Sequence, residues 1–165
     1  MTKDEFIAAA TAAAHASSAH GGFPPGVAVA QAALESAWGS SQLARLAYNY
    51  FGIKARRGRS AITLPTDEYA DGKRVRIAAR FARYASMAEC FADRDRMIAT
   101  LPAYEEARAA AADPDAFVRA LARRWATDPA YAEKLLYLYR AHGFAALDAP
   151  TTLEPATEAQ RHRGD

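Results

Sequence analysis

The distribution of strand and helix signals along the chain constrains its fold most. One segment, residues 75–81, has the period-two alternation of apolar and mostly charged residues that is typical of a half-buried strand. The dipeptide Asp71-Gly72 just before it is a strong signal for a hairpin turn, and residues 61–64 before that are typical of an extended chain. Helix signals occupy the rest of the chain up to residue 148. We therefore predict a mainly helical (mainly α) fold with one small β hairpin.

Capping residues, prolines and glycines predict where the helices begin and end. Thr2 and Ser86 each open a capping box, in which a hydroxyl residue precedes a glutamate three positions later. Glycine ends a helix readily because it adopts the left-handed conformation. We expect a second helix from Pro24-Pro25 to about Trp38 and a short third helix capped by Ser40 or Ser41. Asp113 and Asp128 each precede a proline and are expected to cap two later helices, the last of which ends at Gly143.

The size and composition of the chain fit a single globular domain. It has 165 residues, of which 51% are hydrophobic and 24% charged. We expect one domain at residues 1–148, followed by a disordered tail at residues 149–165, where prolines and mixed polar residues gather. Cys90 is the single cysteine, so no intrachain disulfide forms, and its apolar neighbours predict a structural role as a small hydrophobic residue.

Positive charge is concentrated in the middle of the chain. Residues 54–83 contain nine basic and three acidic residues, whereas the whole chain has a net charge of +2. Such a basic stripe suits a polyanionic partner, either a bacterial wall or a nucleic acid. The alternative interpretation is a solvated strand face.

Glu35 is the residue whose surroundings most suggest acid chemistry. It falls in the last turn of the predicted second helix, where its helical neighbours are small residues and Trp38. Apolar cover from Trp38 and the negative end of the helix dipole would both raise the pKa of the carboxyl. A glutamic acid kept protonated near neutral pH can act as a general acid. The alternative is an ordinary surface glutamate at a helix end.

Other kinds of site lack support in the sequence. The four histidines have neither a cysteine cluster nor the spacing of a zinc site, so we expect no metal ion. No motif supports a serine or cysteine nucleophile, and no phosphate-binding loop is present.

Four segments of the chain contain motifs that follow one another in a set order. The first joins A-L-E-S-A-W-G at residues 33–39 to Y-N-Y-F-G-I-K at residues 48–54. The others are T-D-E-Y at residues 66–69, R-F-A-R-Y-A-S at residues 80–86 and W-A-T-D-P-A-Y-A at residues 125–132. In this order they resemble the peptidoglycan glucosaminidases of glycoside hydrolase family 73, which are mannosyl-glycoprotein endo-beta-N-acetylglucosaminidase-like enzymes. The family includes autolysins, flagellar-rod wall hydrolases and phage endolysins. Together the matches cover roughly residues 6–144.

The resemblance implies a lysozyme-like fold, with the hairpin as one wall of a cleft, and cleavage of the β-1,4 bond between GlcNAc and MurNAc. It implies that Glu35 is the general acid. Glu68, at the hairpin, would be a second catalytic carboxylate that activates water or stabilises the oxocarbenium-like transition state. Asp67 is the alternative because a shift of one residue along a strand exchanges its faces. A salt bridge to a nearby arginine is the structural alternative for Glu68.

The resemblance also implies a set of substrate-binding residues: Trp38, Asn49, Tyr50, Phe51, Tyr84, Trp125 and Tyr131. Core packing is the alternative for the aromatic residues, and we favour it for Phe51. Asn49 has a hydrogen bond to the backbone as its alternative, and Asp93 matches an acidic position for which we favour a structural role. Trp125 departs from the family pattern because tyrosine is usual there and tryptophan lacks the phenolic hydroxyl.

We expect the partner to be the peptidoglycan glycan strand, bound by a monomer without metal or other cofactor, without nucleic acid and without membrane insertion. No apolar run reaches the ~20 residues of a membrane helix, and the acidic start lacks the features of a secretion signal. We therefore expect an enzyme of the bacterial cell wall that acts in the periplasm or outside the cell, after synthesis in a host cytoplasm and release as an endolysin.

Two alternatives stay open. A muramidase or lytic transglycosylase would have the same fold and cut the other linkage, because a fold does not determine which bond is cleaved. A non-catalytic module that binds cell wall or nucleic acid through the basic stripe would bind in a salt-dependent manner that does not require Glu35.

Overall fold

The computed structural model describes residues 1–70 and 73–149, except for the side chains of His20, Glu68, Tyr69, Ala70 and Arg74. The predicted turn at Asp71-Gly72 and the predicted tail from residue 150 onward lie outside the described residues. The mainly helical class with one hairpin is confirmed. In chain order the elements are α1 (Lys3–Gly21), α2 (Pro25–Ser36), α3 (Gln42–Ala47), β1 (Ala61–Ala70), β2 (Lys73–Ala82), α4 (Met87–Thr100), η1 (Pro102–Tyr104), α5 (Glu105–Ala109), α6 (Pro114–Trp125), α7 (Tyr131–Ala141) and η2 (Phe144–Asp148).

Most helix starts follow the capping chemistry of the sequence. The Thr2 hydroxyl accepts a hydrogen bond from the Glu5 amide, and the Glu5 carboxylate accepts one from the Thr2 amide. Ser41, Ser86 and Asp113 cap α3, α4 and α6 through their side-chain oxygens. These predictions are confirmed, because a cap depends on residues only two or three positions apart.

Two predicted boundaries are wrong by about two residues. Helix α2 ends at Ser36 rather than near Trp38, since the backbone is already left-handed at Ala37 and Trp38. Helix α7 begins at Tyr131 rather than at the proline after Asp128. The Asp128 carboxylate accepts a hydrogen bond from the Ala130 amide and so stabilises a turn before the helix.

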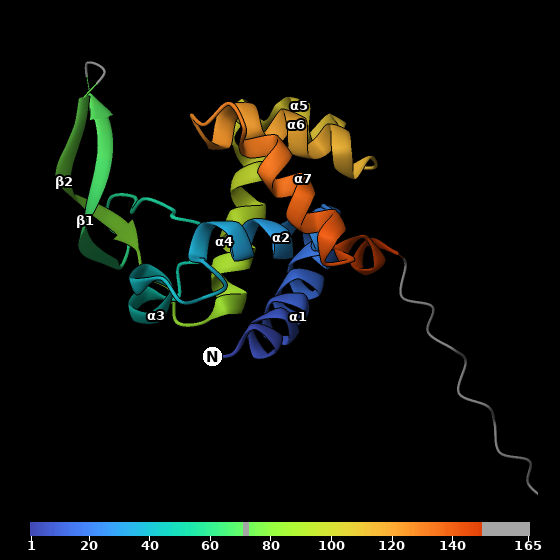
Figure 1. The fold of residues 1–165 in the computed structure, drawn as a ribbon, viewed down its shortest axis with the longest axis horizontal. Coiled ribbons are helices and arrows are strands. Elements are labelled where there is room, and N and C mark those ends of the chain that lie inside the picture. Colours follow the sequence, from blue (N-terminus) through green and yellow to red (C-terminus); the bar gives the residue numbers. More distant parts are fainter. Residues whose placement is uncertain (71–72, 150–165) are drawn as a thin grey trace, which may run out of the picture.

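Helix α2 lies at the centre of the helical body, with α1, α7 and η2 packed against it (Figure 1). Its residues 26–33 are all buried, and most are alanine or valine. Small side chains let the neighbouring helices approach closely on every side of α2. The end of α2, where Glu35 lies, is thereby held by the core of the molecule.

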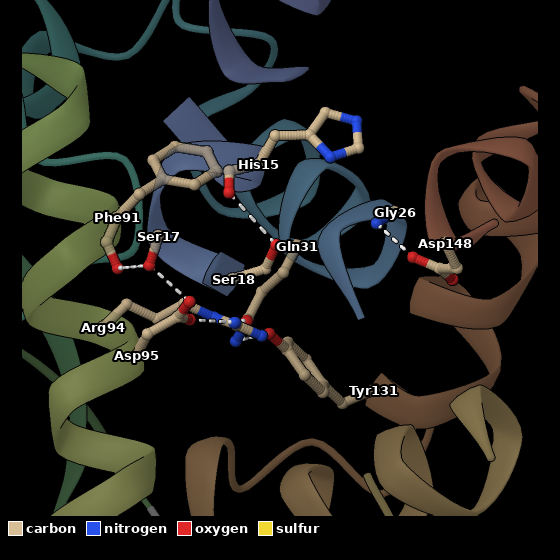
Figure 2. Close-up of polar contacts among 10 residues, drawn as sticks. All are labelled: His15, Ser17, Ser18, Gly26, Gln31, Phe91, Arg94, Asp95, Tyr131 and Asp148. Carbon is tan, nitrogen blue, oxygen red and sulfur yellow. Dashed lines mark hydrogen bonds and ion pairs between the residues drawn. The ribbon is translucent and has the colours of Figure 1, made fainter. Parts of the chain in front are cut away.

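Gly26 illustrates how closely the chain packs at the start of α2. A Cβ atom added there would lie 2.1 Å from the carbonyl oxygen of Phe144, so only glycine fits. The Gly26 amide also donates to Asp148 Oδ1 at 2.6 Å (Figure 2). These contacts hold η2 across the start of α2.

The predicted structural role of Cys90 is consistent with its place in the core. The thiol is fully buried, and its sulfur accepts a hydrogen bond from the Tyr50 amide at 3.4 Å. Burial raises the pKa of the Cys90 thiol to about 12, which keeps it protonated and unreactive.

The hairpin projects from one side of the helical body (Figure 1). Strands β1 and β2 pair antiparallel, with Ala61 opposite Ala82 and Ala70 opposite Lys73. Among the described side chains of β2, Phe81 at the base is buried, whereas Val75 and Ile77 further out are 37% and 44% exposed. The prediction of a half-buried strand is therefore wrong for the outer half of β2.

Candidate active site

A groove runs between the helical body and the hairpin, and Glu35 lies in it. The groove is lined by residues of α2, the loop after α3, the hairpin, α4, η1, α6 and the segment that leads into α7. They are Glu35, Phe51, Gly52, Ile53, Lys54, Arg56, Thr66, Asp67, Phe81, Met97, Tyr104, Trp125, Ala126, Thr127, Asp128 and Tyr131. The groove thus brings the predicted general acid and one of the two alternative second carboxylates to the same surface.

The end of α2 holds Glu35 at the groove. The Ser36 hydroxyl donates to the Ala32 carbonyl at 2.6 Å and accepts from the Gly39 amide at 2.8 Å. The chain then leaves the helix through the left-handed residues Ala37, Trp38 and Gly39. Glu35 therefore lies in the last helical turn, immediately before a sharp change of direction.

Glu35 has the environment of a carboxyl that favours its protonated form. It is partly buried, and its Oε1 atom accepts a hydrogen bond of 2.6 Å from the Tyr131 hydroxyl. Burial is the largest influence and raises the pKa of the Glu35 carboxyl above its ordinary range, while the hydrogen bonds from Tyr131 and Trp125 lower it in part. The net rise is the electrostatic condition that a general acid requires.

Trp38 lies beyond the end of α2, so the helical spacing that was expected to place it over Glu35 does not apply. It packs against Phe6, His142 and Phe144, and the ammonium group of Lys3 lies 4.0 Å from its ring centroid. It is absent from the lining of the groove. Substrate binding by Trp38 stays a prediction.

Asp67 lies on β1 and lines the groove with Glu35. In the strand register it stands opposite Arg76. The backbone of Glu68 pairs with that of Val75 in the same strand pair, and its side chain lies outside the described residues. The choice of Glu68 or Asp67 as the second carboxylate therefore stays a prediction.

Phe51 forms part of the groove floor and is almost fully buried. Its ring contacts those of Phe91 and Trp125, with centroid distances of 4.8 and 6.3 Å. This agrees with the core role that we favoured for Phe51. Trp125 and Tyr131 both line the groove, so their predicted contact with substrate is consistent with where they lie.

Three other predicted substrate-binding residues lie away from the groove lining. Asn49 is 1% exposed, and its amide nitrogen donates to the carbonyl oxygens of Ile53 and Ala82 at 2.9 Å. Tyr50 is buried against Phe6. The Tyr84 hydroxyl donates to Asp93 Oδ2 at 2.7 Å. The polar group or ring of each residue is engaged inside the fold, as the backbone and core alternatives anticipate. Substrate binding by these three residues stays a prediction.

Sequence reasoning missed several groove residues. Lys54 and Arg56 line the groove. The sequence placed both in the basic stripe, and Lys54 in the first family segment, without naming either as a site residue. Lys54 Nζ lies 4.3 Å from the ring centroid of Phe81. Asp128 also lines the groove. It belongs to the last family segment, and the sequence predicted only a helix cap as its role. The shared position of these three side chains depends on the tertiary fold.

The described residues contain no group of three or more His, Cys, Asp or Glu side chains arranged to hold a metal ion. Within the same part of the chain, no helix combines the length and apolar character needed to cross a membrane.

Comparison with known families identifies this arrangement. The family model "Glucosaminidase: Mannosyl-glycoprotein endo-beta-N-acetylglucosaminidase" matches residues 10–143, which include Glu35, the hairpin and Tyr131. The chain belongs to this glucosaminidase family. The resemblance seen in the sequence is therefore confirmed.

Individual members of the glucosaminidase family support this assignment. A probable N-acetylmuramidase of Lactococcus lactis is 35% identical over 156 residues, which cover 90% of this chain and 36% of the relative. The exo-glucosaminidase LytG of Bacillus subtilis is 34% identical over 116 residues, which cover 70% of this chain and 39% of LytG. The chain thus spans less than half the length of these curated relatives.

A solved glucosaminidase-family domain has the same fold. The catalytic domain of the autolysin Auto from Listeria monocytogenes superimposes with a TM-score of 0.79 at 32% identity, covering 88% of this chain and 87% of that domain. The lysozyme-like fold that the resemblance implied is confirmed.

Proposed function

We propose that this chain is a glycoside hydrolase that cleaves the β-1,4 bond between GlcNAc and MurNAc in peptidoglycan, with Glu35 as the general acid. One observation carries the proposal: a partly buried glutamic acid with a raised pKa lies in a groove whose opposite wall carries the Asp67 carboxylate. Two carboxyl groups on either side of a groove are the usual arrangement for glycoside hydrolysis.

In the proposed mechanism the protonated Glu35 carboxyl gives its proton to the leaving glycosidic oxygen. A second carboxylate of the hairpin, Glu68 or Asp67, activates water or stabilises the positive charge that develops on the sugar. Trp125 supplies an aromatic face on which a sugar ring can pack. Lys54 and Arg56 add positive charge to the groove, which suits the carboxylates carried by MurNAc and its peptide.

The names of the relatives disagree about the bond. The Lactococcus lactis relative is named for action on MurNAc and LytG for action on GlcNAc. The description of the matching family favours a glucosaminidase, and we propose that products end in a reducing GlcNAc. A muramidase of the same fold is the second candidate within this class.

The expected monomeric state, action in the periplasm or outside the cell, and release as an endolysin stay predictions. A non-catalytic wall-binding module is the candidate from another class, and the basic stripe of residues 54–83 favours it. A hydrolase requires Glu35 to release glycan fragments, whereas a wall-binding module binds peptidoglycan without it.

The test compares the wild type with Glu35→Gln on purified peptidoglycan. We expect the wild type to release soluble glycan fragments and Glu35→Gln to lose about 10²–10⁴-fold in rate, the range of a general-acid contribution. Glu133→Gln is the matched control because Glu133 is exposed and pairs with Arg119 on α6. Equal rates for wild type and Glu35→Gln would contradict the assignment of Glu35. Salt-sensitive wall binding without fragments from any variant would favour the binding module.

A further inference from the structure

A chain of polar side chains, which includes Tyr131, Gln31 and Arg94, runs through the core (Figure 2), and its Tyr131 end meets Glu35. The Tyr131 hydroxyl, which donates to Glu35 Oε1, accepts a hydrogen bond of 3.2 Å from Gln31 Nε2. Gln31 Oε1 in turn accepts one of 2.9 Å from Arg94 Nε. Gln31 and Arg94 are both 0% exposed. Three helices, α2, α4 and α7, thus contribute to one polar path that ends at the proposed general acid.

The Arg94 end of this path, away from Glu35, is also held in place by its neighbours. Arg94 Nη1 donates to Asp95 Oδ1 at 2.6 Å, and the other oxygen of Asp95 accepts a hydrogen bond from the Ser17 hydroxyl on α1. The guanidinium also lies near the rings of Phe51 and Phe117, at 5.7 and 6.0 Å from their centroids. Arg94 therefore has little freedom to turn away from Gln31.

The chemistry of the guanidinium determines the direction of every hydrogen bond in the path. Arginine can only donate, so the atom of Gln31 that faces it must be the carbonyl oxygen. The amide nitrogen of Gln31 must then face Tyr131 and donate to the phenolic oxygen. With its oxygen occupied by that donor, the Tyr131 hydroxyl directs its own proton to Glu35 Oε1.

The consequence concerns the proton of Glu35 itself. Because Oε1 accepts the hydrogen bond from the Tyr131 hydroxyl, the acidic proton of the neutral carboxyl is carried by the other oxygen, Oε2. We propose that Gln31 and Arg94 are positioning residues that keep the transferable proton of Glu35 on Oε2 by dictating the direction of the Tyr131 hydrogen bond. This inference rests on the proposed role of Glu35 as general acid.

The energetics of the path favour a functional explanation over a structural one. Burying an ion pair carries a desolvation penalty, and packed apolar residues of similar volume are often as stabilising or more so. Arg94 Nη2 is buried without a hydrogen-bond partner among the described residues, which adds to the penalty. Stability alone gives no reason for a charged group at this place, whereas the direction of the hydrogen bond to Glu35 does.

Removing Gln31 would release the constraint. Without a donor at its oxygen, the Tyr131 hydroxyl can accept a hydrogen bond from the protonated Glu35 carboxyl instead of donating one. The neutral carboxyl can then hold its proton on Oε1, turned toward the protein and away from the leaving oxygen. This state is unproductive and also favours the protonated carboxyl, so turnover falls while the pH at which Glu35 loses its proton rises.

Two substitutions of similar shape test the proposal. Gln31→Met removes the donor without adding a charge, and Gln31→Glu keeps a partner for Arg94 while replacing the donor by an acceptor. The measurement is the dependence of kcat and KM on pH for a soluble peptidoglycan fragment. We expect kcat to fall about tenfold or more, a fraction of a full general-acid contribution, with KM nearly unchanged. The basic limb of the kcat profile should move to higher pH, further for Gln31→Glu.

Other titratable and charged groups near Glu35 are unchanged by these substitutions, so the shift can be assigned to Gln31. They are Tyr131 from α7, Tyr104 from η1, Arg94 from α4, and Lys54, Arg56, Asp67 and Asp128 around the groove. The uncharged donor Trp125 from α6 is unchanged as well. The matched control is Ile98→Val, a buried substitution on α4 one helical turn from Arg94 that leaves every polar group of the path unchanged. Thermal unfolding of all variants separates loss of stability from loss of turnover.

Glu35→Gln is assayed beside the Gln31 variants. Suppose that Glu35→Gln is inactive and that both Gln31 variants keep the wild-type dependence of kcat on pH, or change it no more than Ile98→Val does. This result overturns the inference about Gln31 and Arg94 and leaves the proposed function standing. Full activity in Glu35→Gln overturns the proposed function, and this inference with it. The inference is supported if both Gln31 variants have a lower kcat and a basic limb at higher pH, and Ile98→Val shows neither change.

Discussion

Glu35 is held between two opposing influences. Burial at the end of α2 raises the pKa of its carboxyl, while the hydrogen bonds from Tyr131 and Trp125 lower it in part. A carboxyl whose pKa is higher in the folded state than in the unfolded state stabilises the fold while it is protonated, and this contribution is lost as the pH rises through the folded-state pKa. The proposed acid is therefore a source of instability at neutral and alkaline pH.

The raised pKa of Glu35 predicts how Glu35→Gln changes the stability of the protein at different pH values. The neutral glutamine can still accept the Tyr131 hydrogen bond and cannot lose a proton. We expect the Tm of Glu35→Gln to exceed that of the wild type near ~pH 8, with a much smaller difference near ~pH 4, below the ordinary carboxyl pKa. Thermal unfolding of both proteins at the two pH values measures this difference in Tm. A Tm difference independent of pH would show that the folded-state pKa of Glu35 is not raised.

At the scale of elements, the left-handed turn after α2 is the feature that directs the chain away from Glu35. Ala37 has φ 50° and Trp38 has φ 58°, and neither is glycine. Left-handed backbone costs about 1–2 kcal/mol for a residue with a Cβ atom. The hydrogen bonds of Ser36 to Ala32 and Gly39 help to offset this cost.

Ala37→Gly should therefore stabilise the protein. Glycine adopts φ of +50° without a steric penalty but loses more entropy on folding, about 0.5–1 kcal/mol, so we expect a net gain of about 0.5–1 kcal/mol. The same substitution at Ala9, an exposed residue inside α1, should destabilise by about 1 kcal/mol. Denaturant unfolding of the two variants measures the change in the free energy of unfolding of each. A loss of stability in Ala37→Gly would contradict the strain assigned to this turn.

At the scale of the whole molecule, the sequence predicts the features that depend on local chemistry. Thr2, Ser86 and Asp113 cap their helices as expected, because capping requires only neighbouring residues. The class of fold and the family follow from the order of the helix and strand signals and from the four matching segments.

Features set by tertiary contacts were not predictable in this way. No local signal distinguishes Trp38, which packs on Phe6, from Trp125, which lines the groove. Arg94 is fully buried although arginine is usually exposed, so no feature of the sequence connects it with Glu35. The alternation of β2 correctly indicated a strand, but burial of its outer half would have required a second layer that the described chain does not provide.

The identity of the sugar at the new chain end tests the central claim most directly. Purified peptidoglycan is digested with the wild type and with Glu35→Gln, the products are reduced with borohydride, and the reduced sugar is identified by mass spectrometry. We predict reduced GlcNAc ends from the wild type, and from Glu35→Gln only the trace left by its residual rate. Reduced MurNAc or anhydro-MurNAc ends would contradict the bond assignment, and fragments produced equally by Glu35→Gln would contradict the role of Glu35.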